Sequence, residues 1–209
     1  MLGPHLRIDH RPATASLINE CAAVAARSFY TDPFFRHLGP PALLRYRGLA
    51  IFFRANLRHL GRNGRISTVR TTDDHIVGVA GWITTDGYPQ SLYHQLASAP
   101  GTLRALYRRP RALIDGQRYL NAMAREHIKE PHWYLFLLVA DPEIQRQGVG
   151  TALLTEALDH VDREGVAAYL ETQKEDNLAY YRRFGFELVG QLTPTPGGPP
   201  LYCMRRAPR

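Results

Sequence analysis

The segment 132–172 restricts the fold of this chain more than any other part of the sequence. It begins with HWYLFLLVA, whose aromatic and branched residues predict a buried strand. After the turn DPEI, the segment TALLTEALDHVDREG places its apolar residues on one stripe of a helix: Leu153, Leu154, Ala157, Leu158 and Val161. The strand pattern then returns in AAYLET. Strand, helix and strand in this order predict a right-handed crossover within one sheet, and therefore a mixed α/β fold.

The remaining segments add further strands and helices to this unit. Alternating and branched patterns predict strands at 5–10, 65–70, 76–85, 186–191 and 201–206. Helical spacing predicts helices at 13–29, 42–60 and 177–184, and a helical insert at about 88–130 that is broken at Pro110. We expect DPFF, at 32–35, to end the first helix. A chain of 209 residues can build one substantial core, so we expect a single domain over 1–209.

The charge of the chain favours an anionic ligand. The formal net charge of +7 comes almost entirely from arginine, because Lys129 and Lys174 are the only lysines. The arginines at 104, 108, 109 and 111 offer a nucleic-acid-binding alternative. Such runs are usually solvated helix faces, so we expect no nucleic-acid partner.

Other classes of protein are disfavoured by the residue pattern. The nine histidines show no H-x-x-x-H spacing, and Cys21 and Cys203 lie too far apart for a metal knuckle, so we expect no metal. The longest apolar run, at 133–140, is far short of the roughly 20 residues that span a bilayer. The first twelve residues lack the apolar centre of a signal peptide. We therefore expect a cytoplasmic protein that does not associate with a membrane.

QRQGVG, at 145–150, joins the predicted strand to the amphipathic helix. A loop in this position directs unpaired backbone N–H groups outward at a helix N-terminus, which suits a pyrophosphate. The bare pattern is weak evidence, since RYRGLA at 45–50 also fits it but lies inside a helical segment. The spacing excludes a P-loop and a Rossmann turn. A plain strand-to-helix turn remains the alternative.

Three motifs in one order resemble the acetyl-CoA-binding core of the GNAT superfamily of acyl-CoA N-acyltransferases. These are LLVADPEIQRQGVGTALL, YLET and NLAYYRRFGF, and the resemblance is firm over about 132–190. HWYL and ETQKEDNLAYYRRFGF are most similar to the branch of puromycin N-acetyltransferase-like enzymes. The resemblance implies a GNAT-type mixed, mostly antiparallel, splayed sheet flanked by helices. No known motif matches the insert at about 88–130.

The same resemblance implies an enzyme that transfers acetyl from acetyl-CoA to the amine of a small molecule. Transfer would be direct, through a tetrahedral intermediate, in a monomer or homodimer without a metal. A non-catalytic acyl-CoA-binding sensor and a protein N-acetyltransferase are the alternatives.

The resemblance also assigns the residues that bind acetyl-CoA. The strand that carries Leu137 and Val139 would splay from its neighbour and pair its backbone with the pantetheine arm. The pyrophosphate would lie on the backbone of the loop residues Gln145, Arg146, Gln147, Gly148, Val149, Gly150 and Thr151. Asn177 would contact the cofactor or cap the short helix that it begins.

The chemistry requires a general acid and a neutral amine. Tyr181, four residues before Gly185, has the place of the family's general acid, although a packing role for this aromatic residue is the alternative. Glu171, near the end of a strand, is the expected base. His127, Glu130, His132 and a chain of water molecules remain alternatives. The acceptor pocket is expected at Asp32, Phe34, Phe35 and Trp82, with ordinary core packing as the other interpretation of these aromatics.

Overall fold

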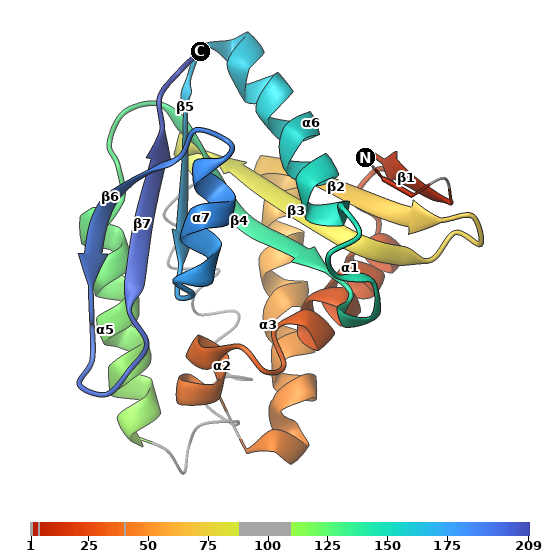
Figure 1. The fold of residues 1–209 in the computed structure, drawn as a ribbon. Coiled ribbons are helices and arrows are strands. Elements are labelled where there is room, and N and C mark those ends of the chain that lie inside the picture. Colours follow the sequence, from red (N-terminus) through yellow and green to blue (C-terminus); the bar gives the residue numbers. More distant parts are fainter. Residues whose placement is uncertain (1, 4, 40, 88–109) are drawn as a thin grey trace.

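A computed structural model describes residues 2–3, 5–39, 41–87 and 110–209 (Figure 1). Its centre is a seven-stranded sheet in the order β1-β2-β3-β4-β5-β7-β6. The strands are, in that order, Leu6–Asp9, Gly64–Thr71, Ile76–Thr84, His132–Ala140, Ala167–Thr172, Leu201–Arg206 and Glu187–Leu192. Only the pairing of β4 with β5 is parallel within the described sheet. This confirms the predicted mixed, mostly antiparallel sheet and the crossover through the helix that follows QRQGVG.

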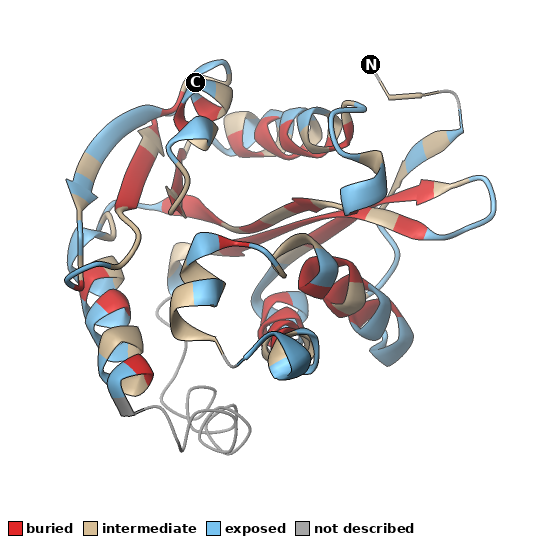
Figure 2. Ribbon diagram, turned by 60° about the horizontal axis from the view of Figure 1, so that its bottom comes forward, coloured by how far each residue is buried: buried red, intermediate tan, exposed pale blue. Residues whose placement is uncertain are grey.

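Helices cover both faces of the sheet (Figures 1 and 2). α6 (Val149–Glu164) and α7 (Asp176–Arg182) pack on one face, where their apolar residues join those of Trp82, Leu135 and Met204 in one core cluster. α1 (Ala15–Ser28) and α3 (Ala42–Asn63) pack on the opposite face against Val79, Leu137 and Val139. α5 (Pro110–Glu126) lies on that second face beside β5 and β7. The central strands β3, β4 and β5 therefore contribute alternate side chains to hydrophobic clusters on both faces of the sheet.

Three helix boundaries differ from the sequence-based expectation. DPFF does end α1, but Asp32 also caps a further short helix, α2 (Pro33–Leu38), because its carboxylate accepts the Phe34 N–H at 3.0 Å. α3 continues past Gly61 to Asn63. The described part of the expected insert is α5, and residues 88–109 lie outside the described residues.

No helix in the described parts of the chain is long and apolar enough to cross a membrane.

Candidate active site

The parallel strands β4 and β5 separate in the middle of the sheet. Their pairing runs from His132 opposite Ala167 to Leu135 opposite Leu170 and then stops. β4 nevertheless continues to Ala140 and stays paired with β3 along this stretch. One backbone edge of β4 therefore faces an opening between β4 and β5 instead of a neighbouring strand. This is the splay that the resemblance implied.

A bulge in β4 marks the place where the strands part. The register with β3 steps from Gly81 opposite Leu137 to Trp82 opposite Leu135, so Phe136 is the extra residue. Beyond the bulge, the Asp141 N–H donates to the Val77 carbonyl at 2.8 Å. Because backbone groups alternate along a strand, Leu137 and Val139 also face β3.

The open edge of β4 therefore belongs to the residues between those two. The geometry assigns it to Leu138 and Ala140, one residue along from the predicted Leu137 and Val139. The Ala140 carbonyl already accepts the Ser28 hydroxyl at 2.7 Å. The N–H and carbonyl of Leu138 and the N–H of Ala140 thus remain to bind an extended ligand in the opening.

The loop between β4 and α6 has the backbone of an anion site. Asp141 caps a short 3₁₀ turn at Pro142–Ile144, and Arg27 holds its carboxylate at 2.5 Å. Arg146 and Gly148 have φ values of +66° and +81°, and helix α6 starts directly afterwards. The left-handed conformation at Gly148 suits glycine, which has no Cβ to clash. The side chains of Gln145, Arg146 and Gln147 are exposed, and the N-terminus of α6 adds partial positive charge.

Gly150 lets a neighbouring tyrosine approach the same helix end. A Cβ at this position would lie 3.1 Å from the hydroxyl of Tyr180, which comes from α7. A side chain here would therefore crowd Tyr180 as well as any phosphate on the loop. The absence of a Cβ at both Gly148 and Gly150 fits the close approach of a pyrophosphate.

Tyr181 lies under α7 on the face of the sheet that α6 covers. Its side chain is 8% exposed and packs with Phe186, with ring centroids 5.9 Å apart. Burial raises the pKa of its phenol, and the neighbouring Tyr180 adds to the shift, so Tyr181 stays protonated at neutral pH. A buried neutral phenol can donate a proton to a thiolate.

Asn177 is the second residue of α7 and does not cap the helix. Its side-chain amide donates to the Thr172 hydroxyl at 2.9 Å, while the capping position belongs to Glu175. The expectation of an N-cap was therefore wrong, and Asn177 instead ties α7 to the end of β5.

Glu171 lies on the opposite face of the sheet from Tyr181, in a buried polar cluster. Its side chain is 1% exposed. The Tyr134 hydroxyl donates to Oε2 at 2.8 Å and the Tyr169 hydroxyl to Oε1 at 3.2 Å. Nδ1 of His127 lies 3.9 Å from Oε1. The two phenols therefore fix the position of the buried carboxylate through one hydrogen bond to each oxygen.

Tyr134 and Tyr169 were not predicted as site residues, although a pattern in the sequence indicates them. Tyr134 and Tyr169 are direct partners in the parallel register, and Tyr169 precedes Glu171 by two residues on the same face of β5. Once the crossover is predicted, aligned tyrosines beside a strand-end carboxylate indicate a shared cluster.

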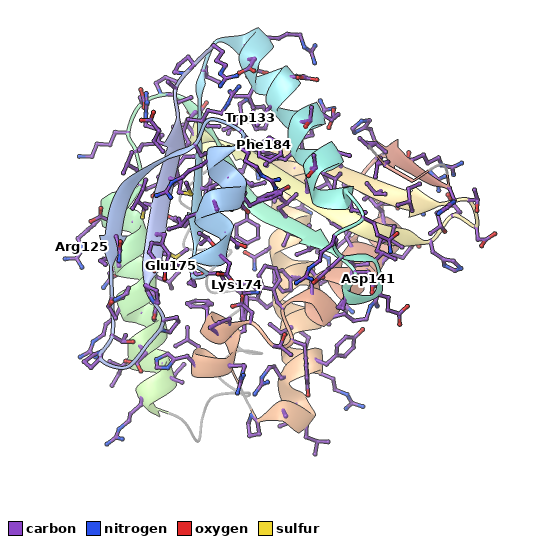
Figure 3. All side chains as sticks on the ribbon, in the orientation of Figure 1. Arg125, Trp133, Asp141, Lys174, Glu175 and Phe184 are labelled. Atoms are coloured by element: carbon purple, nitrogen blue, oxygen red, sulfur yellow. The ribbon has the colours of Figure 1, made fainter. Side chains whose placement is uncertain are left out.

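The four predicted acceptor residues do not form one group. Asp32 is buried, and Lys174 pairs with its carboxylate at 3.1 Å. This ion pair links the start of α2 to the segment before α7, where Figure 3 labels Lys174. Asp32 thus already has a cationic partner, and no pattern in the sequence indicates that this partner is Lys174.

The predicted aromatic residues divide between the two faces. The Phe34 ring contacts Tyr119 of α5, with centroids 5.0 Å apart, and Phe35 packs with Phe53 in the core under α1 and α3. Trp82 is 1% exposed in the other core, beneath α6, so it does not join them. Its burial agrees with the core-packing interpretation. Of the four residues, Phe34 has the position best suited to line an acceptor site, beside α5.

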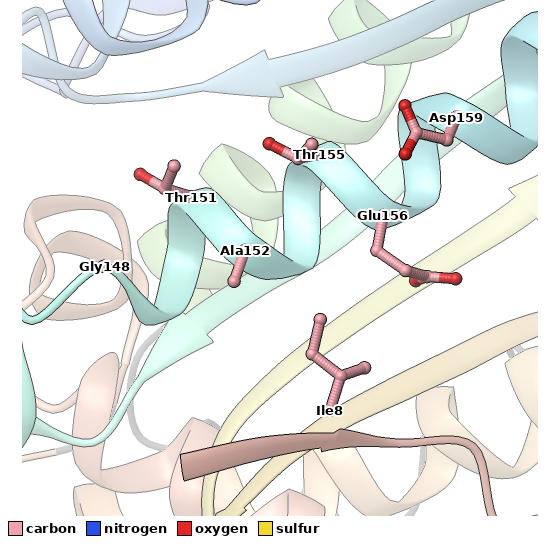
Figure 4. A pocket seen from close by; sticks show the side chains of 7 residues that line it. All are labelled: Ile8, Gly148, Thr151, Ala152, Thr155, Glu156 and Asp159. Atoms are coloured by element: carbon pink, nitrogen blue, oxygen red, sulfur yellow. The ribbon is translucent and has the colours of Figure 1, made fainter. Parts of the chain in front are cut away.

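A separate pocket of about 370 Å³ runs along α6 toward β1 (Figure 4). It borders the loop at Gly148 and Thr151, and the carboxylates of Glu156 and Asp159 line its far part. Neither Glu171 nor Tyr181 lines this pocket. Among the described residues, no three His, Cys, Asp or Glu side chains group closely enough to hold a metal ion.

Comparisons with known proteins agree with this geometry. The sequence profile of the acetyltransferase (GNAT) family matches residues 23–186. The [ribosomal protein bS18]-alanine N-acetyltransferase of Escherichia coli K12 is 34% identical over 85 residues, which cover 34% of this chain and 57% of that protein. The chain thus spans little more than half the length of the curated relatives it matches.

Two solved structures have the same fold over nearly their whole length. A Corynebacterium glutamicum protein described as histone acetyltransferase HPA2 and related acetyltransferase has a TM-score of 0.72 at 23% identity, covering 98% of this chain and 97% of that one. Arylalkylamine N-acetyltransferase 2 of Aedes aegypti has a TM-score of 0.60 at 12% identity, covering 98% and 99%. At these identities the likeness shows the fold alone. With the profile match, which spans most of the chain, it follows that the protein belongs to the acetyltransferase (GNAT) family.

Proposed function

We propose that the enzyme acetylates the amine of a small molecule by direct transfer through a tetrahedral intermediate, with Glu171 as the base and Tyr181 as the acid. One observation carries the proposal: β4 and β5 part after Leu135 and Leu170, and the two side chains approach from opposite faces of the sheet. A thioester in the opening would have the base on the side where the amine arrives and the acid on the side where the thiolate leaves.

Donor binding and the two proton transfers are assigned to different residues of this chain. The Leu138 and Ala140 backbone groups would hold the pantetheine arm, and the loop Gln145–Thr151 with Asn177 would hold the rest of the donor. Glu171 would accept the proton that the amine loses as its nitrogen forms the new C–N bond. Tyr181 would give its proton to sulfur as the C–S bond breaks, and solvent would restore it.

Contacts near the opening support a small acceptor. α2, α5 and the segment between β6 and β7 are joined there: Phe34 packs on Tyr119, and the Tyr119 hydroxyl donates to the Pro199 carbonyl at 2.5 Å. His37 of α2 lies 3.4 Å from Asp115 of α5. A wall of this kind leaves less room for a folded protein substrate than an open edge would. The resemblance to the puromycin N-acetyltransferase-like branch points the same way.

The second candidate is acetylation of a protein N-terminus. It is favoured by the match to the E. coli enzyme, whose name gives ribosomal protein alanine as its target. The Asp32 carboxylate is already paired with Lys174, so it would not bind a cationic small molecule, and this also favours the second candidate.

Thiol release from acetyl-CoA distinguishes the candidates. The acceptors are a panel of alkyl and arylalkyl amines, peptides with N-terminal alanine, and amine-free buffer. We expect kcat/KM for the best small amine to exceed that for every peptide by at least about tenfold, roughly 1.4 kcal/mol. A preference for peptides would establish the second candidate instead. Stabilisation by desulfo-CoA without thiol release from any acceptor would indicate a sensor and contradict both.

A further inference from the structure

We infer that His127 and His132 form a relay of fixed tautomers that takes the proton from Glu171 during transfer. His127 receives the proton, and His132 positions His127. The inference rests on the proposed function, because it takes Glu171 as the base. Three contacts lead from the Glu130 backbone through the two histidines to the Glu171 carboxylate.

The tautomer of His132 is set by the backbone. Its Nδ1 lies 2.7 Å from the Glu130 carbonyl oxygen, which can only accept. Nδ1 therefore carries the hydrogen, and Nε2 of the neutral ring keeps a lone pair. Burial lowers the pKa of His132, so the neutral ring is the resting form.

The tautomer of His127 follows from that of its neighbour. The two Nε2 atoms lie 3.0 Å apart, and the ring centroids 4.8 Å. Since Nε2 of His132 accepts, Nε2 of His127 must donate. Nδ1 of His127 then keeps the lone pair, and this atom faces Oε1 of Glu171 at 3.9 Å.

This arrangement is suited to accept a proton. A lone pair that faces a carboxylate repels it, and a proton between the two atoms converts the contact into an ion pair. When Glu171 takes the proton of the acceptor amine, the proton can move on to Nδ1 of His127. The products of this step are a restored carboxylate and an imidazolium. No oxidant or further reactant is needed.

The other groups described around Glu171 are not suited to accept its proton. The Tyr134 and Tyr169 hydroxyls both donate to the carboxylate, and burial raises the pKa of Tyr169, so Tyr169 holds its proton. The Cys203 thiol has its pKa raised by burial to about 11. Two further carboxylates among the described residues near the pair, those of Glu126 and Glu130, belong to exposed residues.

His127 also offers the proton a way out. Its side chain is 10% exposed, whereas that of Glu171 is 1% exposed. The rings of Tyr134 and Tyr169 lie edge-on to it, with centroids 5.1 and 4.9 Å away, and hold the ring in place. The histidine is therefore the member of the pair through which solvent receives the proton.

Substitutions at both histidines test the relay. His127→Gln removes the acceptor atom, and we expect kcat to fall by about 10²-fold, the lower range for proton transfer by a side chain. The acid limb of the kcat profile should change shape, and added imidazole should restore part of the rate. His132→Gln keeps an amide acceptor near the Nε2 position and should retain most of the activity, whereas His132→Leu should not.

The control is His160→Gln, which changes a histidine of α6 that pairs with Glu164 at 3.1 Å. It should leave kcat and its pH profile unchanged. Desulfo-CoA stabilisation of each variant shows that the site has folded. Suppose that the wild type is active, but His127→Gln keeps the same pH profile and is not rescued by imidazole. That result would overturn the relay and leave the proposed function intact. A wild type that is inactive with every amine would instead contradict the proposed function.

The wild type offers a second test that does not depend on folding of a variant. Nitrogen-15 NMR of histidine-labelled enzyme at neutral pH should show His132 protonated on Nδ1 and His127 on Nε2. A His127 ring protonated on Nδ1 would contradict the proposed tautomers.

Discussion

At the scale of the residue, two adjacent tyrosines of α7 lie in different surroundings. Tyr180 directs its hydroxyl toward Gly150, at the N-terminus of α6. Tyr181 packs into the core beside the opening between β4 and β5. Both have a phenol pKa raised by burial. Tyr181 is our proposed general acid because it lies four residues before Gly185, where the resemblance places that residue.

Tyr181→Phe should lower kcat by about 10²-fold. Because burial raises the pKa of Tyr181, the phenol remains a proton donor across the whole working range, so the shape of the pH profile should not change. Tyr180→Phe is the matched control and should keep kcat within about threefold. Steady-state thiol release at saturating acetyl-CoA is the measurement. Equal losses in the two variants would show that packing, not proton transfer, explains the effect.

The sequence predicted single residues best where a motif fixes them. Tyr181 and Glu171 follow from NLAYYRRFGF and YLET, and their roles stay predictions. Side chains that act through long-range contacts were not predictable, because their partners are distant in sequence. Lys174 meets Asp32 across 142 positions of the chain, and Tyr134 meets Glu171 only because two strands align in parallel.

At the scale of elements, the two copies of one short pattern have different structures. QRQGVG lies between a strand and a helix, with Gly148 at a φ of +81°. RYRGLA lies within α3, where Gly48 continues a helix. The flanking elements therefore distinguish a loop between a strand and a helix from a helical segment, as predicted from their hydrophobic patterns.

Substitutions at these two glycines should have opposite effects. Gly148→Ala places a Cβ in a left-handed conformation, which costs about 1–2 kcal/mol of stability, and it should raise the KM for acetyl-CoA by about tenfold. Gly48→Ala should stabilise the helix by about 0.5–1 kcal/mol and leave that KM unchanged. Thermal unfolding and initial rates measure both effects. An unchanged KM in Gly148→Ala would mean that the loop backbone does not bind the donor.

At the scale of the whole molecule, a network of charges fixes the N-terminal strand to the rest of the sheet. Asp74, in the turn between β2 and β3, accepts from Arg7 and Arg11 at 2.8 and 2.7 Å. These interactions lower the pKa of Asp74 to about 2, with Arg11 as the largest cause. The buried Arg70 also pairs with Asp9 of β1 at 2.9 Å.

The lowered pKa of Asp74 predicts how stability depends on pH. The carboxylate favours the folded state above its ordinary pKa of 3.8, and this contribution is lost as the pH falls from there toward about 2. Asp74→Asn should therefore reduce the fall of the melting temperature over that range, since asparagine tolerates the φ of +65°. Asp73→Asn, one residue earlier, is the control. Parallel melting curves for Asp74→Asn and wild type would contradict the pairing.

The arrangement of the sheet was predictable in outline but not in detail. Hydrophobic patterns predicted the crossover and most strands, and the resemblance implied the splay. The Asp141–Val77 hydrogen bond and the alternation of backbone groups assign the open edge of β4 to Leu138 and Ala140, and a bulge lies at Phe136. A bulge depends on packing against both neighbouring strands, and no local pattern in HWYLFLLVA indicates it.

In the proposed reaction, Glu171 accepts the amine proton beside a thioester held between β4 and β5. The most direct test is the single-turnover rate of thiol release in Glu171→Gln with saturating acetyl-CoA and the best amine. We predict a fall of at least about 10²-fold, with the affinity for desulfo-CoA unchanged. Glu187→Gln, an exposed carboxylate on β6, is the control. A Glu171→Gln rate within about threefold of wild type at every pH would contradict the account.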